Sequence, residues 1–221
     1  MNKLMTDAWR TSGARYNAAR RLRRRAFFST ASLAFFSAAT VGLAFVQIVV
    51  PEAGNVELPR YLSLLSALLG VFILALSLIE WGARNNERAE NLHRNAEALN
   101  GFSKRLRIKS EAAGATEAAG LVSPAQSASN ELKLSMQDEY DAIKATCFDN
   151  HDPIDDEMFL VQFSGADELK VNGEIRRGWL ASLRIKASYH LSSIWYFGLC
   201  WVVLVVAVWS APWPADACPG V

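Results

Sequence analysis

The chain has 221 residues, 51% of them hydrophobic, and its 23 basic and 22 acidic residues leave a formal net charge of +1. Positions 1–25 nevertheless contain eight Lys/Arg and one Asp, whereas positions 110–175 contain 14 acidic residues and three Lys. The acidic middle region would repel nucleic acid, so direct nucleic-acid binding is not expected. The basic N-terminal region would be attracted to anionic lipid. The three cysteines, Cys147, Cys200 and Cys218, are too few for a disulfide scaffold.

Residues 1–25 are predicted to form a basic cytoplasmic helix that leads into a transmembrane helix over 26–50. The segment 26–50 has 25 residues and no charge, which is more than a helix needs to cross a hydrocarbon core of roughly 30 Å. Small residues recur in it every four positions, namely Ala34, Ala38 and Gly42. This spacing lets helices approach closely, so it predicts packing either within one chain or between subunits.

Residues 61–79 form a second uncharged apolar segment of 19 residues. A short polar turn after residue 50 joins it to the first, which predicts a transmembrane hairpin over 26–79. Ser66 and Gly70 repeat the four-residue spacing of small side chains. The same two kinds of packing, within the chain and between subunits, are open to them.

A polar juxtamembrane helix is predicted over residues 80–109, running on from the second span without a Gly or Pro break of consequence. Leu92, Leu99 and Leu106 recur every seven residues, and the other seam positions hold Arg88, Asn95 and Phe102. A leucine seam that contains Asn is typical of coiled coils. The pattern fits either a helix packed on later helices of the same chain or a self-associating stalk.

Residues 110–129, rich in Ala, Gly and Ser, are predicted to form a flexible linker, and residues 130–189 a cytoplasmic helical region. Apolar residues of its first part share one helical face: Leu132, Met136, Tyr140, Ile143 and Cys147. Asp152 followed by Pro153 predicts the start of another helix, because Asp caps helices and Pro is tolerated at the first position. Ile175, Trp179 and Leu183 predict the face of a helix that leads into the next span.

Residues 191–210 form a third uncharged apolar segment, followed by a tail over 211–221 that has no Lys or Arg. Basic residues gather before the first span, after the second and before the third, whereas the loop between the first two spans has only Arg60. This distribution predicts that the N-terminus and the middle region are cytoplasmic and that the tail lies outside. The sequence therefore predicts an all-α integral membrane protein with a helical hairpin, a cytoplasmic helical region and a third transmembrane helix.

No phosphate-binding loop, serine nucleophile elbow or HExxH motif occurs in the sequence. Cys147, His151 and Asp155 lie four residues apart and could share a metal-binding face, but Pro153 is expected to break a helix between them. A capped helix start with a solvated acidic face explains the same residues. We therefore predict no catalytic, cofactor or metal site, and no enzyme.

Three segments of the chain are informative together: Trp9–Leu22 at the start, Arg88–Leu99 in the juxtamembrane helix, and Asn150–Asp155 late in the cytoplasmic region. These segments resemble SLATT-domain proteins, the SMODS and SLOG-associating two-transmembrane effectors of bacterial conflict systems. The resemblance covers roughly residues 5–185 and is to the subfamily often encoded beside reverse transcriptases. The third span departs from the two-span definition of the family.

The resemblance implies a membrane effector without catalytic residues or cofactors. Such an effector acts in the bacterial inner membrane when an operon-encoded partner, of nucleotidyltransferase or reverse transcriptase type, signals infection. The cell then dies or stops growing. This form of antiviral defence is called abortive infection.

Three functions are open on these grounds. The first is a homo-oligomer that forms a pore in the lipid bilayer or disrupts it. The second is a membrane anchor or sensor subunit that docks a soluble partner through the acidic region 131–157, with Tyr140 and Phe159 on the docking surface. The third is an unrecognised enzyme that depends on His151 or Asp155.

Overall fold

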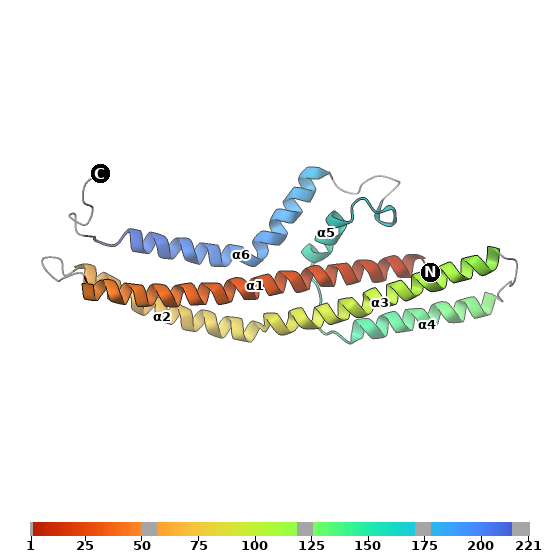
Figure 1. Cartoon of the computed structure of the whole chain (residues 1–221), viewed down its shortest axis with the longest axis horizontal. Helices are drawn as coiled ribbons and strands as arrows, with labels where there is room; N and C mark the ends of the chain where they lie inside the picture. Colours follow the sequence, from red (N-terminus) through yellow and green to blue (C-terminus); the bar gives the residue numbers. More distant parts are fainter. Residues whose placement is uncertain (1, 50–56, 119–125, 171–177, 214–221) are drawn as a thin grey trace. The chain divides into compact units, whose positions relative to one another are not determined.

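The computed structural model describes residues 2–49, 57–118, 126–170 and 178–213, and every regular element in these ranges is helical (Figure 1). The elements in chain order are α1 (Asn2–Val49), α2 (Glu57–Ala83), α3 (Asn85–Ala118), α4 (Gln126–Ala145), α5 (Pro153–Gln162), a 3-10 helix (Asp167–Leu169) and α6 (Trp179–Trp209). Three stretches are long and apolar enough to cross a membrane, and they begin in α1, α2 and α6. The predicted all-α fold with a third candidate span is therefore confirmed.

The described helices fall into two compact units. The first, here called the polar unit, comprises residues 1–23 and 86–192, and the second, the membrane unit, comprises residues 24–85 and 193–221. α1 and α6 are each continuous helices that contribute to both units. The predicted N-terminal helix and first span are thus one helix.

The polar unit has a core in which α3 packs against the beginning of α1 and against α4 (Figure 1). The leucines of the predicted seam, Leu92, Leu99 and Leu106, are all fully buried in this core. Met136 and Tyr140 of the predicted α4 face are buried with them, whereas Leu132 is exposed. The seam thus lies inside its own chain, as the first of the two interpretations had it.

α5 begins where the Asp-Pro pair predicts a helix. Pro153 is the first helical residue, and the carboxylate of Asp155 accepts a hydrogen bond from the backbone N–H of Asp152 at 3.0 Å. The bond satisfies a backbone donor near the helix start and places negative charge at the positive end of the helix dipole. The helix ends at Gln162, just before Ser164 and Gly165.

The predicted continuity between the second span and the polar helix is wrong. α2 ends at Ala83, and Arg84 has a φ of 48°, in the left-handed region, which interrupts the helical hydrogen-bond ladder. The side-chain amide of Asn85 donates to Glu80 at 2.9 Å on the other side of the interruption. The break falls at the boundary between the two units.

The helices around the predicted linker are longer than expected. α3 continues to Ala118 and α4 begins at Gln126, so helix occupies both ends of the interval 110–129. The Ala-rich composition near residue 115 favours helix, and Arg107 forms an i,i+4 ion pair with Glu111 at 2.9 Å. The centre of the predicted linker, like most of the turn after residue 50, Ile175 and Cys218, lies outside the described residues.

The membrane unit is built from the second part of α1, all of α2 and the second part of α6. Its core consists of Phe36, Leu43, Leu58, Leu62, Leu69, Leu76, Phe197, Leu204 and Ala211. Many large apolar side chains remain exposed on the same helices, among them Phe45, Leu74 and Val202. Helices that are apolar on the inside and on the outside suit a surrounding of lipid.

Candidate functional site

The stripe of small residues on α1 faces away from the core of the membrane unit. Ala34, Ala38 and Gly42 are all exposed, and a Cβ added at Gly42 would meet nothing within 4 Å. The buried side of this part of α1 includes Ser32 and Phe36 instead. Within the described residues, the stripe therefore lies on the exposed side of α1.

The second small-residue pair lies at the edge of the packed surface. Ser66 and Gly70 on α2 are half-buried, and a Cβ added at Gly70 would also meet nothing within 4 Å. The described part of the membrane unit therefore leaves room beside Gly70.

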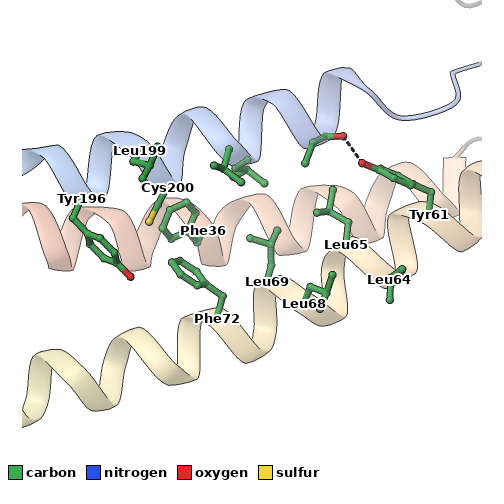
Figure 2. A pocket seen from close by; sticks show the side chains of 13 residues that line it. Phe36, Tyr61, Leu64, Leu65, Leu68, Leu69, Phe72, Tyr196, Leu199 and Cys200 are labelled. Carbon is green, nitrogen blue, oxygen red and sulfur yellow. Dashed lines mark hydrogen bonds between the residues drawn. The ribbon is translucent and has the colours of Figure 1, made fainter.

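An apolar groove runs between α2 and α6, with Phe36 of α1 at its floor (Figure 2). Its volume is about 580 Å³. The wall residues are Tyr61, Leu64, Leu65, Leu68, Leu69 and Phe72 from α2, and Tyr196, Leu199, Cys200, Val203, Leu204 and Ala207 from α6. Among the described residues, no charged side chain lines it. The sequence does not predict this groove, because the spacing of apolar residues along each helix does not show how far apart two helices lie.

Polar contacts also join the described helices of the membrane unit. The hydroxyl of Tyr61 donates to the carbonyl oxygen of Ala207 at 2.8 Å, and the indole N–H of Trp201 donates to the hydroxyl of Ser32 at 3.0 Å. These contacts fasten α6 to α2 and to α1. The hydrocarbon of a bilayer offers no hydrogen-bond partner, so these bonds satisfy polar groups that would otherwise remain unpaired.

In the polar unit, arginines of α1 hold the beginning of α5. Arg10 donates to both carboxylate oxygens of Asp156, at 2.7 and 2.5 Å, and Arg21 donates to both oxygens of Asp155 at 2.9 Å and also binds Asp152. The side chain of Asp155 is 0% exposed. Bidentate arginine–carboxylate pairs fix geometry as well as charge.

The charge state of these arginines follows from their surroundings. The hydrogen bond to Asp156 raises the pKa of Arg10. Burial acts to lower the pKa of Arg21, but the hydrogen bonds and negative charges of Asp155 and Asp152 outweigh it and raise that pKa. Both guanidinium groups therefore remain charged at any physiological pH.

Asn95, the polar member of the predicted seam, connects three helices of its own chain. Its amide nitrogen donates to the carbonyl of Ile143 at 2.5 Å and to the hydroxyl of Thr146 at 2.9 Å, and its amide oxygen accepts from buried Arg15. Burial lowers the pKa of Arg15. Asn95 therefore belongs to a buried polar network within one subunit, although its position in the leucine pattern is also typical of a coiled coil.

A polar cleft of about 560 Å³ lies where α1, α4 and the start of α5 meet. Its walls are formed by Asp7, Arg10, Thr11, Gln137, Tyr140, Asp141, Lys144, His151, Pro153 and Asp156. Burial lowers the pKa of His151, against the opposing effect of Asp156, and the buried Nδ1 of this ring has no hydrogen-bond partner in the described part of the chain. The imidazole is therefore neutral near pH 7.

The three residues considered as a metal site have separate roles. Asp155 pairs with Arg21, Cys147 packs beside the cluster around Leu22, and His151 lines the polar cleft. Within the four described ranges, no group of three or more His, Cys, Asp and Glu residues is arranged to hold a metal ion.

The expected docking residues are not on the surface. Tyr140 is 7% exposed and Phe159 is 1% exposed, so both belong to the interior of the polar unit. Phe148, in the segment between α4 and α5, is instead fully exposed. No pattern in the sequence distinguishes Phe148, because an isolated aromatic residue in a polar segment has no periodicity.

The comparison with protein-family models gives one finding. The model described as SMODS and SLOG-associating 2TM effector domain family 5 matches residues 1–211. No curated protein and no solved structure is similar enough to this chain to count as a match.

Proposed function

Because this chain belongs to the SMODS and SLOG-associating 2TM effector domain family, we propose that it is the membrane effector of a bacterial conflict system. In this proposal the protein lies in the inner membrane with its polar unit in the cytoplasm. An operon-encoded partner, of nucleotidyltransferase or reverse transcriptase type, signals infection. The effector then assembles into a homo-oligomer that opens a pore, and the cell stops growing.

The exposed stripe on α1 carries the proposal. Ala34, Ala38 and Gly42 are apolar, lie on a helix long enough to cross a membrane, and are exposed in the described part of the chain. Lipid tails are as apolar as leucine, so helices associate in membranes through close packing, which small residues permit. A second copy placed on the stripe would gain that packing, and the absence of charge in the spans does not prevent a pore from forming between subunits.

The test is expression of the full chain under tight control in a bacterium, with and without its neighbouring operon. Membrane potential and the entry of a membrane-impermeant dye are followed after triggering. We expect rapid depolarisation, and we expect Ala38→Leu to abolish it by filling the stripe. Ala44→Leu is the matched control, because Ala44 is exposed on the same helix outside the repeat of four. A membrane potential that stays intact with a triggered, inserted wild-type protein would refute pore formation.

A second function, docking of a soluble partner, is favoured by one observation. Phe148 is fully exposed beside Asp149, which forms an ion pair with Arg88 of α3 at 2.8 Å. An apolar ring held on a fixed segment is a suitable anchor for a protein interface. Because Tyr140 and Phe159 are interior, the docking surface in this alternative is formed around Phe148.

Phe148→Asp tests this alternative without disturbing the core. If the protein is a docking subunit, the variant should insert normally but fail to recover the operon-encoded partner in a pull-down from detergent-solubilised membranes. Exposed Leu134→Asp on α4 serves as the control. Full recovery with Phe148→Asp would exclude this surface.

A further inference from the structure

The groove between α2 and α6 is open along one side. Leu64 and Leu68 on α2, and Leu199 and Val203 on α6, line it and are exposed (Figure 2). Beneath them the floor is closed by buried Phe36 and Leu69. The groove is therefore a furrow on the outer surface of the membrane unit.

In a bilayer this furrow cannot contain water at low cost, because its lining offers almost no polar partner. A vacant furrow would deprive the lining atoms of dispersion contacts. Its volume of about 580 Å³ lies within the range of about 300–1,000 Å³ that is usual for sites that hold one small molecule. A flexible apolar chain is the occupant that the bilayer itself supplies.

One end of the furrow argues against a helix as the occupant. There the Tyr61 hydroxyl donates to Ala207 at 2.8 Å and bridges α2 to α6. A straight helix with its side chains is about 10 Å across and would collide with this bridge if it lay along the furrow. An acyl chain is narrow and flexible, so it can bend past the bridge.

The same end carries a positive charge. Arg60 directly precedes Tyr61 in the first turns of α2 and is exposed. It forms no ion pair with any residue that the structure describes. Tyrosine favours the membrane interface, and a guanidinium group binds phosphate through two parallel hydrogen bonds. Arg60 is thus placed where a phospholipid that enters the furrow would carry its phosphate.

We propose that the furrow between α2 and α6 binds one acyl chain of a membrane phospholipid, whose phosphate is held by Arg60. The site lies within the membrane unit and does not depend on pore formation. It would give the unit a fixed lipid in place of a rapidly exchanging one.

Photo-crosslinking tests the acyl chain. The full chain is reconstituted in vesicles of about three parts phosphatidylethanolamine to one part phosphatidylglycerol, with a trace of phosphatidylglycerol that carries a diazirine on its acyl chain. Peptides that contain Leu64 and Leu68, or Leu199 and Val203, should be labelled more than the peptide that contains Phe45 of α1, which is exposed outside the furrow. Equal labelling of all these peptides would mean ordinary lipid contact only and would overturn the proposal.

A blocking variant makes this test sharper. Leu68→Trp places a bulky ring in the mouth of the furrow and should remove the excess labelling. Leu78→Trp is the matched control, because Leu78 is exposed on the same helix and does not line the furrow. Excess labelling that persists in Leu68→Trp would contradict the site. Circular dichroism shows whether each variant keeps its helices.

Lipid retention tests the phosphate contact. Native mass spectrometry of the purified full chain should show one retained phosphatidylglycerol. Arg60→Gln should weaken retention about tenfold, which corresponds to about 1.4 kcal/mol, and Arg60→Lys should weaken it less. Arg84→Gln removes an exposed charge at the other end of α2 and should leave retention unchanged. Unchanged retention in Arg60→Gln would overturn the assignment of the phosphate.

Discussion

The polar unit and the membrane unit are held together by different chemistry. In the polar unit, buried or half-buried charged groups join helices that are distant in sequence, as Arg21 and Asp155 do. In the membrane unit, the helices meet through an apolar cluster, with hydroxyl and indole bonds such as that of Tyr61 and the partly exposed ion pair of Arg25 with Glu80. We therefore expect the loss of one buried charge to destabilise the polar unit more than the loss of one hydroxyl destabilises the membrane unit.

The difference follows from the surroundings of each unit. In water, burial of apolar surface drives helices together, and polar contacts then select one arrangement among several. In lipid, that drive between helices is absent, so close packing and a few satisfied polar groups decide the arrangement. The predictions below test whether this contrast holds, beginning with the largest expected effect.

Arg21→Ala should strongly destabilise the polar unit. It leaves the carboxylate of Asp155, which is 0% exposed, without its charged partner. Breaking a buried pair by removing one partner costs about 3–5 kcal/mol. The loss is measured as faster hydrogen exchange of α5 in the full-length protein in detergent.

Arg23→Ala is the control for this prediction. Arg23 pairs with Glu90 at 3.1 Å on the surface, and both side chains are about half exposed. An exposed pair contributes about 0–1 kcal/mol, so exchange should barely change. Similar effects of the two variants would contradict the assignment of Arg21 to a buried contact.

Gly13→Ala should be the next most damaging change. A Cβ at this position would lie 2.1 Å from Cδ2 of Phe159, so α1 and α5 would have to move apart. Overpacking costs about 1–3 kcal/mol, which exceeds the gain of up to about 1 kcal/mol from replacing Gly by Ala in a helix. Thermal unfolding should therefore occur at a lower temperature in this variant.

Gly101→Ala in α3 provides the matched control. Its added Cβ would lie 3.6 Å from an Arg105 side-chain nitrogen, an ordinary contact, so the change should be neutral or stabilising. Adding Phe159→Leu to Gly13→Ala should recover part of the lost stability. A Gly13→Ala protein as stable as the Gly101→Ala protein would show that α1 and α5 are not closely packed there.

The sequence predicts these helices better than it predicts their contacts. Uncharged length identifies the spans, and Asp152 with Pro153 identifies the start of α5, because both signals are local. The contact of Gly13 with Phe159 has no local signal, since the two residues are far apart in the chain.

The periodicity of apolar residues does not identify the partner of a helix face. It shows that Leu92 and Leu99 share a helix face, but it does not show whether the partner face belongs to the same chain. The structure buries both residues in the polar unit. For the same reason, the repeat of small residues in α1 predicts close packing without identifying the partner, and only the exposure of Ala34 and Ala38 shows that the partner is not the chain's own core.

His151 predicts a pH dependence of the polar unit. Burial lowers its pKa, although Asp156, Asp155 and Asp152 oppose this and Arg15 adds to it. The unfolded chain takes up a proton near pH 6.5, and the folded chain takes it up only at lower pH. The free energy of unfolding should therefore fall as the pH drops through that window.

His151→Gln isolates this contribution. The thermal midpoints of the wild type and the variant are compared at about pH 7.5 and about pH 5.5. The carboxylates are common to both proteins, so the wild type should lose more stability on acidification than the variant does. Parallel losses would show that His151 titrates equally in the folded and unfolded states. The effect should be smaller than that of Gly13→Ala, because the ring is only partly buried.

The smallest effects are expected when one hydroxyl is removed from each unit. Tyr61→Phe deletes the bond to Ala207 in the membrane unit, and Tyr189→Phe deletes a 2.7 Å bond from the buried Tyr189 hydroxyl to the carbonyl oxygen of Asn17 in the polar unit. Hydrogen bonds between membrane helices contribute about 0.6 kcal/mol on average, and those in water-soluble proteins about 1 kcal/mol. Both variants should thus remain close to the wild type in unfolding by detergent and heat. A loss of about 3 kcal/mol or more in Tyr61→Phe would equal that of a buried charge pair, and the membrane unit would then depend on polar contacts as strongly as the polar unit does.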